Sequence, residues 1–257
     1  MSSYREDLAH INDAGFADFT EGASPGLLFL LRRYRVDSGM VVDLGCGSGH
    51  WARTLTDAGY EVLGVDLSPA QIALAEKRAP KAHFQTESLM SVAIPACDAI
   101  TAIGEIVNYQ FDTTQTRSGL SRLFRRAFKA LRPGGLLIFD VAGPDRVPKT
   151  VPALFWKESP DWSIFVDVDG NAQARWMTRR IVCFRRNADG FFRRSEELHR
   201  LRLHHPEDIL AELKSIGFIA RVTDRYGSFR LYPGMHAIIA RKPRTSLGAV
   251  LPGKSLI

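Results

Sequence analysis

The sequence predicts an α/β protein with a doubly wound, mostly parallel sheet, helices on both faces and an inserted antiparallel three-stranded meander. Two observations support this prediction. From Met40 to Val141, strand-like apolar runs alternate with helical patterns, and such alternation favours a parallel sheet covered by helices. After Pro144, strand-like runs follow one another with turn residues between them, which predicts antiparallel hairpins.

The first half of the chain is expected to begin with helices. Residues 4–34 have a helical apolar pattern, which Gly15, Gly22 and Gly26 should divide into two or three short helices. A nearly continuous apolar run ends before Gly45, as in a buried parallel strand, and a helical pattern begins at Trp51. Further strands are expected over residues 61–65, 82–86, 98–103 and 136–141. Helices should follow Ser68-Pro69, a favoured helix start, and span residues 120–131.

The second half should contain the meander and the end of the main sheet. Pro148, Pro152 and Pro160 indicate a loop, and strands are expected over 162–168, 172–186 and 191–204. A helix ending at Gly217 and strands over 218–223 and 236–241 follow. We therefore divide the chain into a helical cap (1–35), a core (36–145), the insertion (146–205), a return helix with two strands (206–243) and a tail (244–257).

Composition limits the number of domains, the class of protein and the cellular compartment that we expect. The chain has 257 residues and a formal net charge of +6, which suits one large domain with an insertion. No apolar run approaches the ~18 residues of a membrane span, and the first residues lack a secretory pattern. Cys46, Cys97 and Cys183 are odd in number and widely spaced, so neither a disulfide framework nor a metal site is expected. A reducing cytoplasm fits best.

The turn after the first strand is the most informative motif. Gly45, Gly47 and Gly49 permit the positive φ angles and close ligand approach that such a turn needs. A dinucleotide fingerprint would place its third glycine one residue later. Asp43 would repel a pyrophosphate but suits an ammonium group, and Asp66, about 20 residues on, could receive ribose hydroxyls. An ammonium and a ribose together describe S-adenosylmethionine.

The chain resembles the class I S-adenosylmethionine-dependent methyltransferases. Asp43-x-Gly45-x-Gly47-x-Gly49 matches the first motif of that family, residues 65–68 match its ribose-binding strand end, and residues 131–135 match the turn entering its fifth strand. The resemblance covers roughly residues 1–243, strongly to Val141. It implies a Rossmann-like fold, S-adenosylmethionine as cofactor, and an acceptor site beside the insertion.

The resemblance also implies cofactor contacts. Glu87 would read the adenine, or would be only an acid at a helix start, and Ile103 and Gly104 would contact the methionine half. Cys46 is expected to be a packing residue rather than a nucleophile, and aromatic residues of the N-terminal segment could form a lid or simply pack the helices. The lid residues would be Tyr4, His10, Phe16 and Phe19. The full expected cofactor set is Tyr4, Phe19, Asp43, Gly45, Cys46, Gly47, Gly49, Asp66, Leu67, Glu87, Ser88, Leu89, Ile103, Gly104 and Glu105.

No motif identifies a catalytic residue, because methyl transfer needs mainly positioning and sometimes a base. Glu197 and His199 are two residues apart on an expected strand, so they share a face. They could bind or deprotonate an acceptor, or form a solvent-facing pair. A pocket wall could come from five aromatic residues, with Arg179, Arg200 or His199 holding a polar group. The aromatic residues are Phe155, Trp156, Trp162, Phe165 and Trp176.

Residues 175–202 of the insertion are rich in arginine, with nine arginines against three acids. Such a ribbon could bind RNA, keep a solvated strand face soluble, or hold an anionic small molecule. We favour the last two, since the ribbon lacks the aromatic pattern of a single-strand binder, and the chain has no proline between Pro95 and Pro133 for a purine N-methylation motif. The predicted function is methylation of a small-molecule acceptor, which could be anionic. The alternatives are an RNA or protein methyltransferase docking through the arginine-rich insertion, and a non-transferring cofactor-binding protein.

Overall fold

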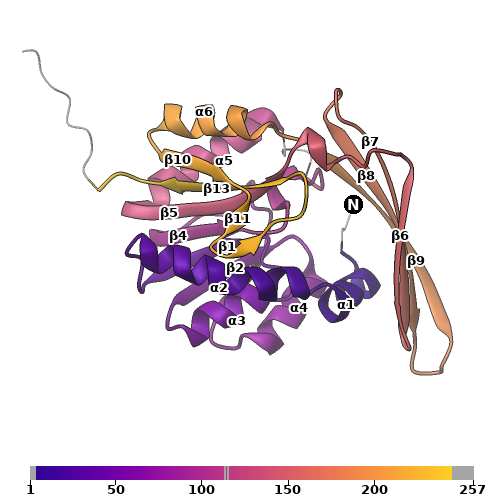
Figure 1. Cartoon of the computed structure of the whole chain (residues 1–257). Coiled ribbons are helices and arrows are strands. Elements are labelled where there is room, and N and C mark those ends of the chain that lie inside the picture. The colour runs from indigo at the N-terminus through magenta and orange to yellow at the C-terminus, as the bar shows by residue number, and fades with distance from the viewer. Residues whose placement is uncertain (1–3, 113, 115, 245–257) are drawn as a thin grey trace, which may run out of the picture.

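The computed structural model describes residues 4–112, 114 and 116–244, and Figure 1 shows two sheets standing next to each other. The main sheet has seven strands in the order β10-β13-β5-β4-β1-β2-β3. Only β13 runs against its neighbours, β5 and β10, so the mostly parallel sheet is confirmed. The strands are β1 (Met40–Leu44), β2 (Glu61–Asp66), β3 (His83–Thr86), β4 (Cys97–Ala102), β5 (Leu131–Ala142), β10 (Ile219–Thr223) and β13 (Met235–Arg241).

Helices cover both faces of this sheet. On one face, α5 (Arg117–Ala130) and α6 (Pro206–Ile216) share a buried apolar cluster with β4 and β5. On the other, α2 (Asp18–Arg33) and α3 (His50–Asp57) contribute Leu27, Leu31, Trp51 and Leu55 to a second cluster. Ser68 caps α4 (Pro69–Arg78) by accepting a hydrogen bond from the Gln71 N–H at 3.2 Å. Short 3₁₀ turns, Ile106–Asn108 and Pro144–Arg146, follow β4 and β5.

The N-terminal segment forms two helices, within the two or three that were expected, but only one of the three glycines divides it. Gly15 ends α1 (Glu6–Gly15), but Gly22 and Gly26 lie inside α2 and do not divide it. The reason at Gly26 is close packing, since a Cβ there would lie 1.9 Å from the carbonyl oxygen of Tyr226. That residue belongs to a small hairpin that the sequence did not predict, made of β11 (Arg225–Tyr226) and β12 (Phe229–Arg230).

The inserted sheet has four antiparallel strands rather than three, in the order β6-β7-β8-β9. They are β6 (Ala153–Ser159), β7 (Trp162–Asn171), β8 (Trp176–Arg186) and β9 (Phe192–Arg202). The expected loop was wrong for β6 because Pro152 and Pro160 lie just outside its two ends. A proline there costs no ladder hydrogen bond, and β6 is an edge strand that pairs with β7 alone.

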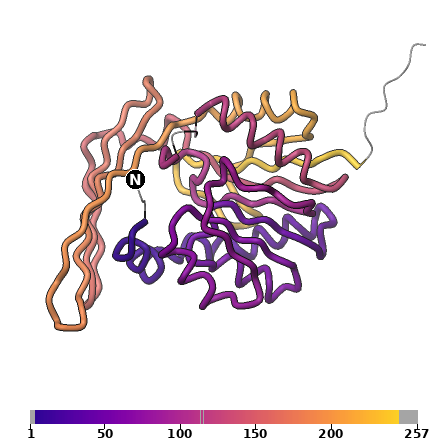
Figure 2. Tube along the Cα trace, turned by 180° about the vertical axis from the view of Figure 1, so that it is seen from behind, coloured from indigo at the N-terminus to yellow at the C-terminus, as the bar shows by residue number. Residues whose placement is uncertain are grey.

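Helix α1 lies between the two sheets (Figure 2). Its Leu8 and Ile11 pack with Trp162, Ile164 and other residues of β7 and β8 in a separate apolar cluster. The N-terminal segment therefore joins the insertion to the main body. No helix in the described part of the chain combines the length and apolarity needed to cross a membrane. Most of the tail, from residue 245 onward, lies outside the described residues.

Candidate functional site

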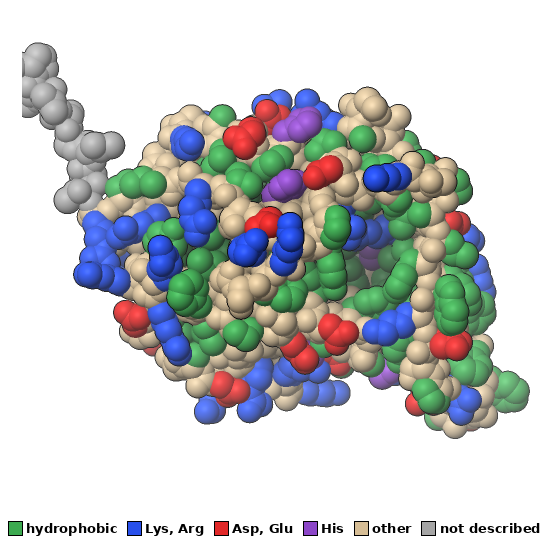
Figure 3. Space-filling model, viewed as in Figure 1, with side chains coloured by type: hydrophobic (Ala, Val, Ile, Leu, Met, Phe, Trp, Pro, Cys, Tyr) green, Lys and Arg blue, Asp and Glu red, His purple; other side chains and the backbone are tan. Residues whose placement is uncertain are grey.

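A cavity of about 770 Å³ opens at the carboxyl edge of the main sheet, facing the inserted sheet. Figure 3 shows the molecule hollowed between these two parts. Four parts of the chain supply the walls, and the segment before and at the start of β13 contributes Tyr232, Pro233 and Met235. The core contributes Asp43, Gly45, Cys46, Gly47, Asp66, Ile103, Gly104 and Glu105; the N-terminal segment Tyr4, Leu8, Asn12, Phe16 and Phe19; the insertion Phe155, Ile164, Val166, Val168, Arg179, Ile181 and His199.

The three glycines of the turn serve different purposes. All have positive φ, at 73°, 53° and 82° for Gly45, Gly47 and Gly49, a region that favours glycine. A Cβ on Gly45 would lie 2.5 Å from Ile106, and one on Gly49 would lie 2.9 Å from Ala75. A Cβ on Gly47 would meet nothing closer than 4.0 Å. Gly47 thus leaves backbone open to a ligand, while Gly45 and Gly49 permit close packing.

Asp66, at the end of β2, holds this turn in place. Its carboxylate accepts hydrogen bonds from the Gly47 N–H at 3.0 Å and the Ser68 N–H at 2.9 Å. Burial raises the pKa of Asp66, although both backbone donors oppose that rise. Each carboxylate oxygen has a second acceptor site, so Asp66 can still receive hydroxyl groups from the cavity it lines.

Asp43 lies deeper, at the end of β1, and is almost fully buried. The Thr101 hydroxyl donates to it at 2.7 Å, and Trp51 Nε1 donates to Thr101 at 3.2 Å. Desolvation raises the pKa of Asp43 to about 7, and the charge of Asp66 adds to this rise. A cation in the cavity would favour the ionised form of Asp43.

A smaller cavity of about 60 Å³ adjoins the large one beyond Asp66. Its walls include four residues expected near the adenine, namely Leu67, Glu87, Ser88 and Leu89. Glu87 accepts a hydrogen bond from the hydroxyl of Ser91 at 3.1 Å. Asp112 also lines this cavity and accepts from the Ser88 hydroxyl. Sequence reasoning missed Asp112, since it belongs to no motif and lies in an irregular segment.

The opposite end of the large cavity contains an acid between two arginines. Glu105 adopts a left-handed conformation with φ of 62°, and its carboxylate accepts from Arg146 Nε at 2.8 Å and from the Arg179 guanidinium at 2.7 Å. Burial alone would raise the pKa of Glu105, but the two arginines lower it overall. Arg179 also donates to the Tyr109 hydroxyl at 3.1 Å. Sequence reasoning missed Arg146, which follows the fifth strand without a motif.

Asp140 positions the turn that carries Glu105. It is completely buried in β5 and accepts hydrogen bonds from the Gly104 N–H at 2.9 Å, the Glu105 N–H and the Tyr226 hydroxyl at 2.8 Å. Desolvation raises the pKa of Asp140 to about 6. Together these bonds fix the loop after β4, where Ile103 and Gly104 line the cavity as expected.

Glu197 and His199 lie on the inner face of β9, so the solvent-facing alternative is wrong. His199 is only 1% exposed, and its Nε2 lies 3.0 Å from the Glu197 carboxylate. That carboxylate also accepts from the backbone N–H groups of Tyr4 and Arg5, both at 2.8 Å. Within the described residues, Nδ1 of His199 is buried without a hydrogen-bond partner.

The N-terminal segment is attached to the site at three places. Besides the bonds to Glu197, the carbonyl oxygen of Tyr4 accepts from the Ser68 hydroxyl at 2.6 Å. Asp13 of α1 pairs with Arg78 at 2.6 Å and with His50 Nε2 at 3.1 Å. Of the expected lid residues, Tyr4, Phe16 and Phe19 line the cavity, and His10 is not among its walls.

The expected aromatic wall is only partly present. Phe155 lines the cavity, and Trp162 is buried against α1. Trp156, Phe165 and Trp176 lie on the outer face, where they are 38–55% exposed. The register explains this, because Trp156 pairs with Phe165 and neighbouring residues point to opposite faces. Arg200 and Trp176 share that outer face with Phe165.

The arginine-rich ribbon is largely ion-paired. Arg180 and Arg194 both contact Glu196, and Arg193 contacts Asp7 of α1. Carboxylate partners lie within 4.0 Å of Arg175, Arg179, Arg180, Arg185, Arg186, Arg193 and Arg194.

The three cysteines are free and buried, and burial raises the pKa of Cys46 well above its usual value, which keeps it a neutral thiol. No group of acids, histidines and cysteines among the described residues could hold a metal ion.

Comparisons with known proteins agree with this geometry. A methyltransferase domain family model matches residues 41–135. A protein of Geobacillus sp. (strain WCH70) that is named a methyltransferase is 26% identical over 73% of this chain and 77% of its own length. An S-adenosylmethionine-dependent methyltransferase from Clostridium acetobutylicum superposes with a TM-score of 0.77 at 20% identity, over 92% of this chain and 98% of that one. The sugar N-methyltransferase KedS8 from Streptoalloteichus reaches 0.73 at 21% identity, over 92% of each chain.

Proposed function

This chain belongs to the class I S-adenosylmethionine-dependent methyltransferases, and on that premise we propose that it methylates a small molecule held between the main sheet and the inserted sheet. The observation that carries the proposal is the large cavity, which continues past the cofactor motifs to residues of β7, β8 and β9. Many apolar walls with a few polar groups are typical of small-molecule sites. The similar KedS8 protein acts on a sugar.

The residues expected to bind S-adenosylmethionine have the chemistry that this cofactor needs. The open backbone at Gly47 and the free acceptor sites of Asp66 suit a ribose, and Asp43 suits an ammonium group. Leu67, Glu87, Ser88 and Leu89 would surround the adenine in the small cavity. S-adenosylmethionine, when bound, supplies an activated methyl group, so the protein's part is to position the acceptor, exclude water and accept a proton where needed.

An anionic group on the acceptor would suit the far end of the cavity. Glu105 carries one negative charge and its two partners, Arg146 and Arg179, carry two positive ones, so the group has one positive charge in excess. Buried charges are costly unless compensated. An acceptor carboxylate or phosphate beside Arg146 would supply that compensation.

We assign the proton-accepting role to His199 rather than Glu197. The Glu197 carboxylate already accepts from His199 and two backbone N–H groups, so it positions the imidazole. A carboxylate on Nε2 favours the proton on that nitrogen, which leaves Nδ1 as the acceptor. Nδ1 has no partner within the described part of the chain, and an acceptor O–H or N–H would provide one.

Two features favour this function over the alternatives. Most arginines of the insertion are paired with acids of the chain itself, which leaves little free charge for RNA. A non-transferring protein would have no need of a cavity extending beyond its cofactor. The three buried thiols suit the reducing cytoplasm, where we place the protein.

The test is a substitution whose larger side chain fills only the acceptor side of the cavity. Val166 lines the cavity at the middle of β7, and Val182 lies on the outer face of β8. We expect Val166→Trp to abolish methylation of a pooled metabolite extract, followed with a labelled methyl group, while S-adenosylmethionine affinity stays within about tenfold, roughly 1.4 kcal/mol. Val182→Trp is the matched control and should keep full turnover. Full turnover by Val166→Trp would refute the placement of the acceptor.

A further inference from the structure

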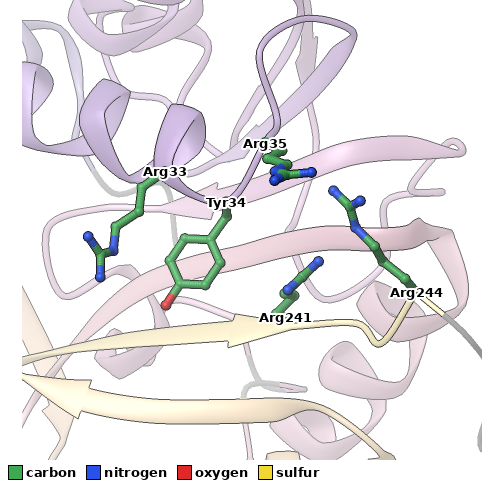
Figure 4. Close-up of a pocket in the computed structure, with 5 residues that line it drawn as sticks. All are labelled: Arg33, Tyr34, Arg35, Arg241 and Arg244. Atoms are coloured by element: carbon green, nitrogen blue, oxygen red, sulfur yellow. The ribbon is translucent and has the colours of Figure 1, made fainter.

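A second cavity, of about 560 Å³, lies at the opposite edge of the main sheet from the cofactor motifs. Its walls are Arg33, Tyr34, Arg35, Arg241 and Arg244 (Figure 4). The first three come from the end of α2 and the last two from the end of β13. The other ends of these two elements, at Phe19 and Met235, line the large cavity between the main sheet and the inserted sheet, which we call the reaction cavity. We call this second cavity the arginine pocket.

In the described part of the chain, the four arginines have no acidic partner. Figure 4 shows Arg35, Arg241 and Arg244 on one side of the Tyr34 ring, with their guanidinium groups turned to a common space. Within the residues described, none of the four lies within 4.0 Å of a carboxylate, unlike Arg132 nearby, which pairs with Asp98. Nε of Arg241 is buried and has no hydrogen-bond partner among residues 4–112, 114 and 116–244. A bound anion would compensate the clustered positive charges and would accept a hydrogen bond from the buried Nε–H of Arg241.

Two further details favour a site over a chance cluster. The Tyr34 hydroxyl accepts from Arg221 Nε at 3.2 Å, so its own hydrogen is directed elsewhere and can be donated. Arg35, two residues beyond the last residue of α2, has φ of 62°, and the N–H of Val36 is bonded to the Leu31 carbonyl at 2.9 Å. Glycine is the usual residue in that conformation. The chain keeps an arginine there despite the backbone strain.

We propose that the arginine pocket binds a multiply charged phosphate-type oxyanion, separately from the methyl-transfer site. Guanidinium groups present paired N–H donors that match phosphate oxygens, and several of them converging can neutralise more than one negative charge. The phosphate can be free, as in pyrophosphate, or be the phosphate chain of a nucleotide. This proposal does not depend on the identity of the methyl acceptor.

Calorimetry on the full chain tests it, with inorganic pyrophosphate and ATP as probes at constant ionic strength. We compare the native protein with Arg35→Gly/Arg241→Gln, because glycine suits the backbone at residue 35. The control is Arg122→Gln/Arg125→Gln, which removes two exposed arginines of α5. We expect the pocket variant to lose at least tenfold in pyrophosphate affinity and the control to stay within twofold.

Both variants should bind S-adenosylhomocysteine as the native protein does, which shows that they are folded. Equal affinity for pyrophosphate and ATP would indicate the free anion, and tighter ATP binding would indicate a nucleotide; either result supports the site. Absence of pyrophosphate and ATP binding at 1 mM, or equal losses in the two variants, would overturn it.

Discussion

At the scale of single residues, Asp66 has two tasks, because it holds the glycine turn and faces the cavity. We predict that Asp66→Ala and Gly47→Val each abolish detectable S-adenosylmethionine binding while the protein stays folded. The first change removes hydrogen-bond acceptors, worth ~1–3 kcal/mol or more. The second places a branched side chain on backbone with φ of 53° that faces open space. Calorimetry with circular dichroism checks this, and near-native affinity in both variants would refute the cofactor assignment.

Asp43 gives a prediction about pH. Its pKa of about 7 leaves most of the carboxyl protonated at about pH 6 and ionised at about pH 8. Because a cationic ligand prefers the ionised form, S-adenosylmethionine affinity should rise about tenfold over this range. Asp43→Asn should bind more weakly and lose most of this pH dependence. Titrations of both proteins at several pH values decide it, and an equally steep rise in Asp43→Asn would exclude Asp43 as the cause.

The raised pKa of Asp43 also makes the free energy of unfolding depend on pH. The folded pKa of Asp43 lies above its ordinary value of 3.8, so the folded state binds more protons than the unfolded state between about pH 4 and 7. The free energy of unfolding of the ligand-free protein should therefore fall as pH rises through this window. Asp140, whose pKa burial raises to about 6, contributes with the same sign.

At the scale of elements, the N-terminal segment that contains Tyr4 and α1 is held by contacts on both sides. Tyr4 bonds to Ser68 of the core and to Glu197 of the insertion. We predict that Glu197→Gln makes residues 4–19 more sensitive to limited proteolysis, because a neutral amide binds backbone N–H groups less strongly, and that S-adenosylhomocysteine protects this segment in the native protein. Glu212→Gln on α6 serves as control. Identical cleavage of all three proteins, with and without ligand, would show that α1 is fixed scaffold.

The elements also show what the sequence could predict. β1, β2 and β4 were predicted from apolar runs followed by glycine or aspartate, and Ser68-Pro69 located a helix start correctly. β6 was missed because its flanking prolines resemble those of a loop, although they fall outside the hydrogen-bonded ladder. Gly26 was misinterpreted since only the fold brings Tyr226 against it. Contacts between distant segments leave no local pattern.

At the scale of the whole molecule, the same limit applies to the site. The residues that we propose to face the cofactor lie at the carboxyl ends of strands along one sheet edge, so motif spacing was enough to predict that Asp43, Gly47 and Asp66 lie close together. The residues on the proposed acceptor side come from different elements: Glu105 follows β4, Arg146 follows β5, and Arg179 lies in β8. Their proximity depends on how the insertion stands against the main sheet, which the sequence does not encode locally.

The two elements that end at the arginine pocket, α2 and β13, begin at the reaction cavity. If an anion at one end alters the affinity for S-adenosylhomocysteine at the other, thermodynamic reciprocity requires S-adenosylhomocysteine to alter anion affinity by the same factor. Two experiments measure this factor independently. In one, pyrophosphate is titrated with and without saturating S-adenosylhomocysteine, and in the other, S-adenosylhomocysteine is titrated with and without saturating pyrophosphate. Equal factors different from one would make the protein a sensor of phosphate compounds, whereas a factor of one would make the two ends independent.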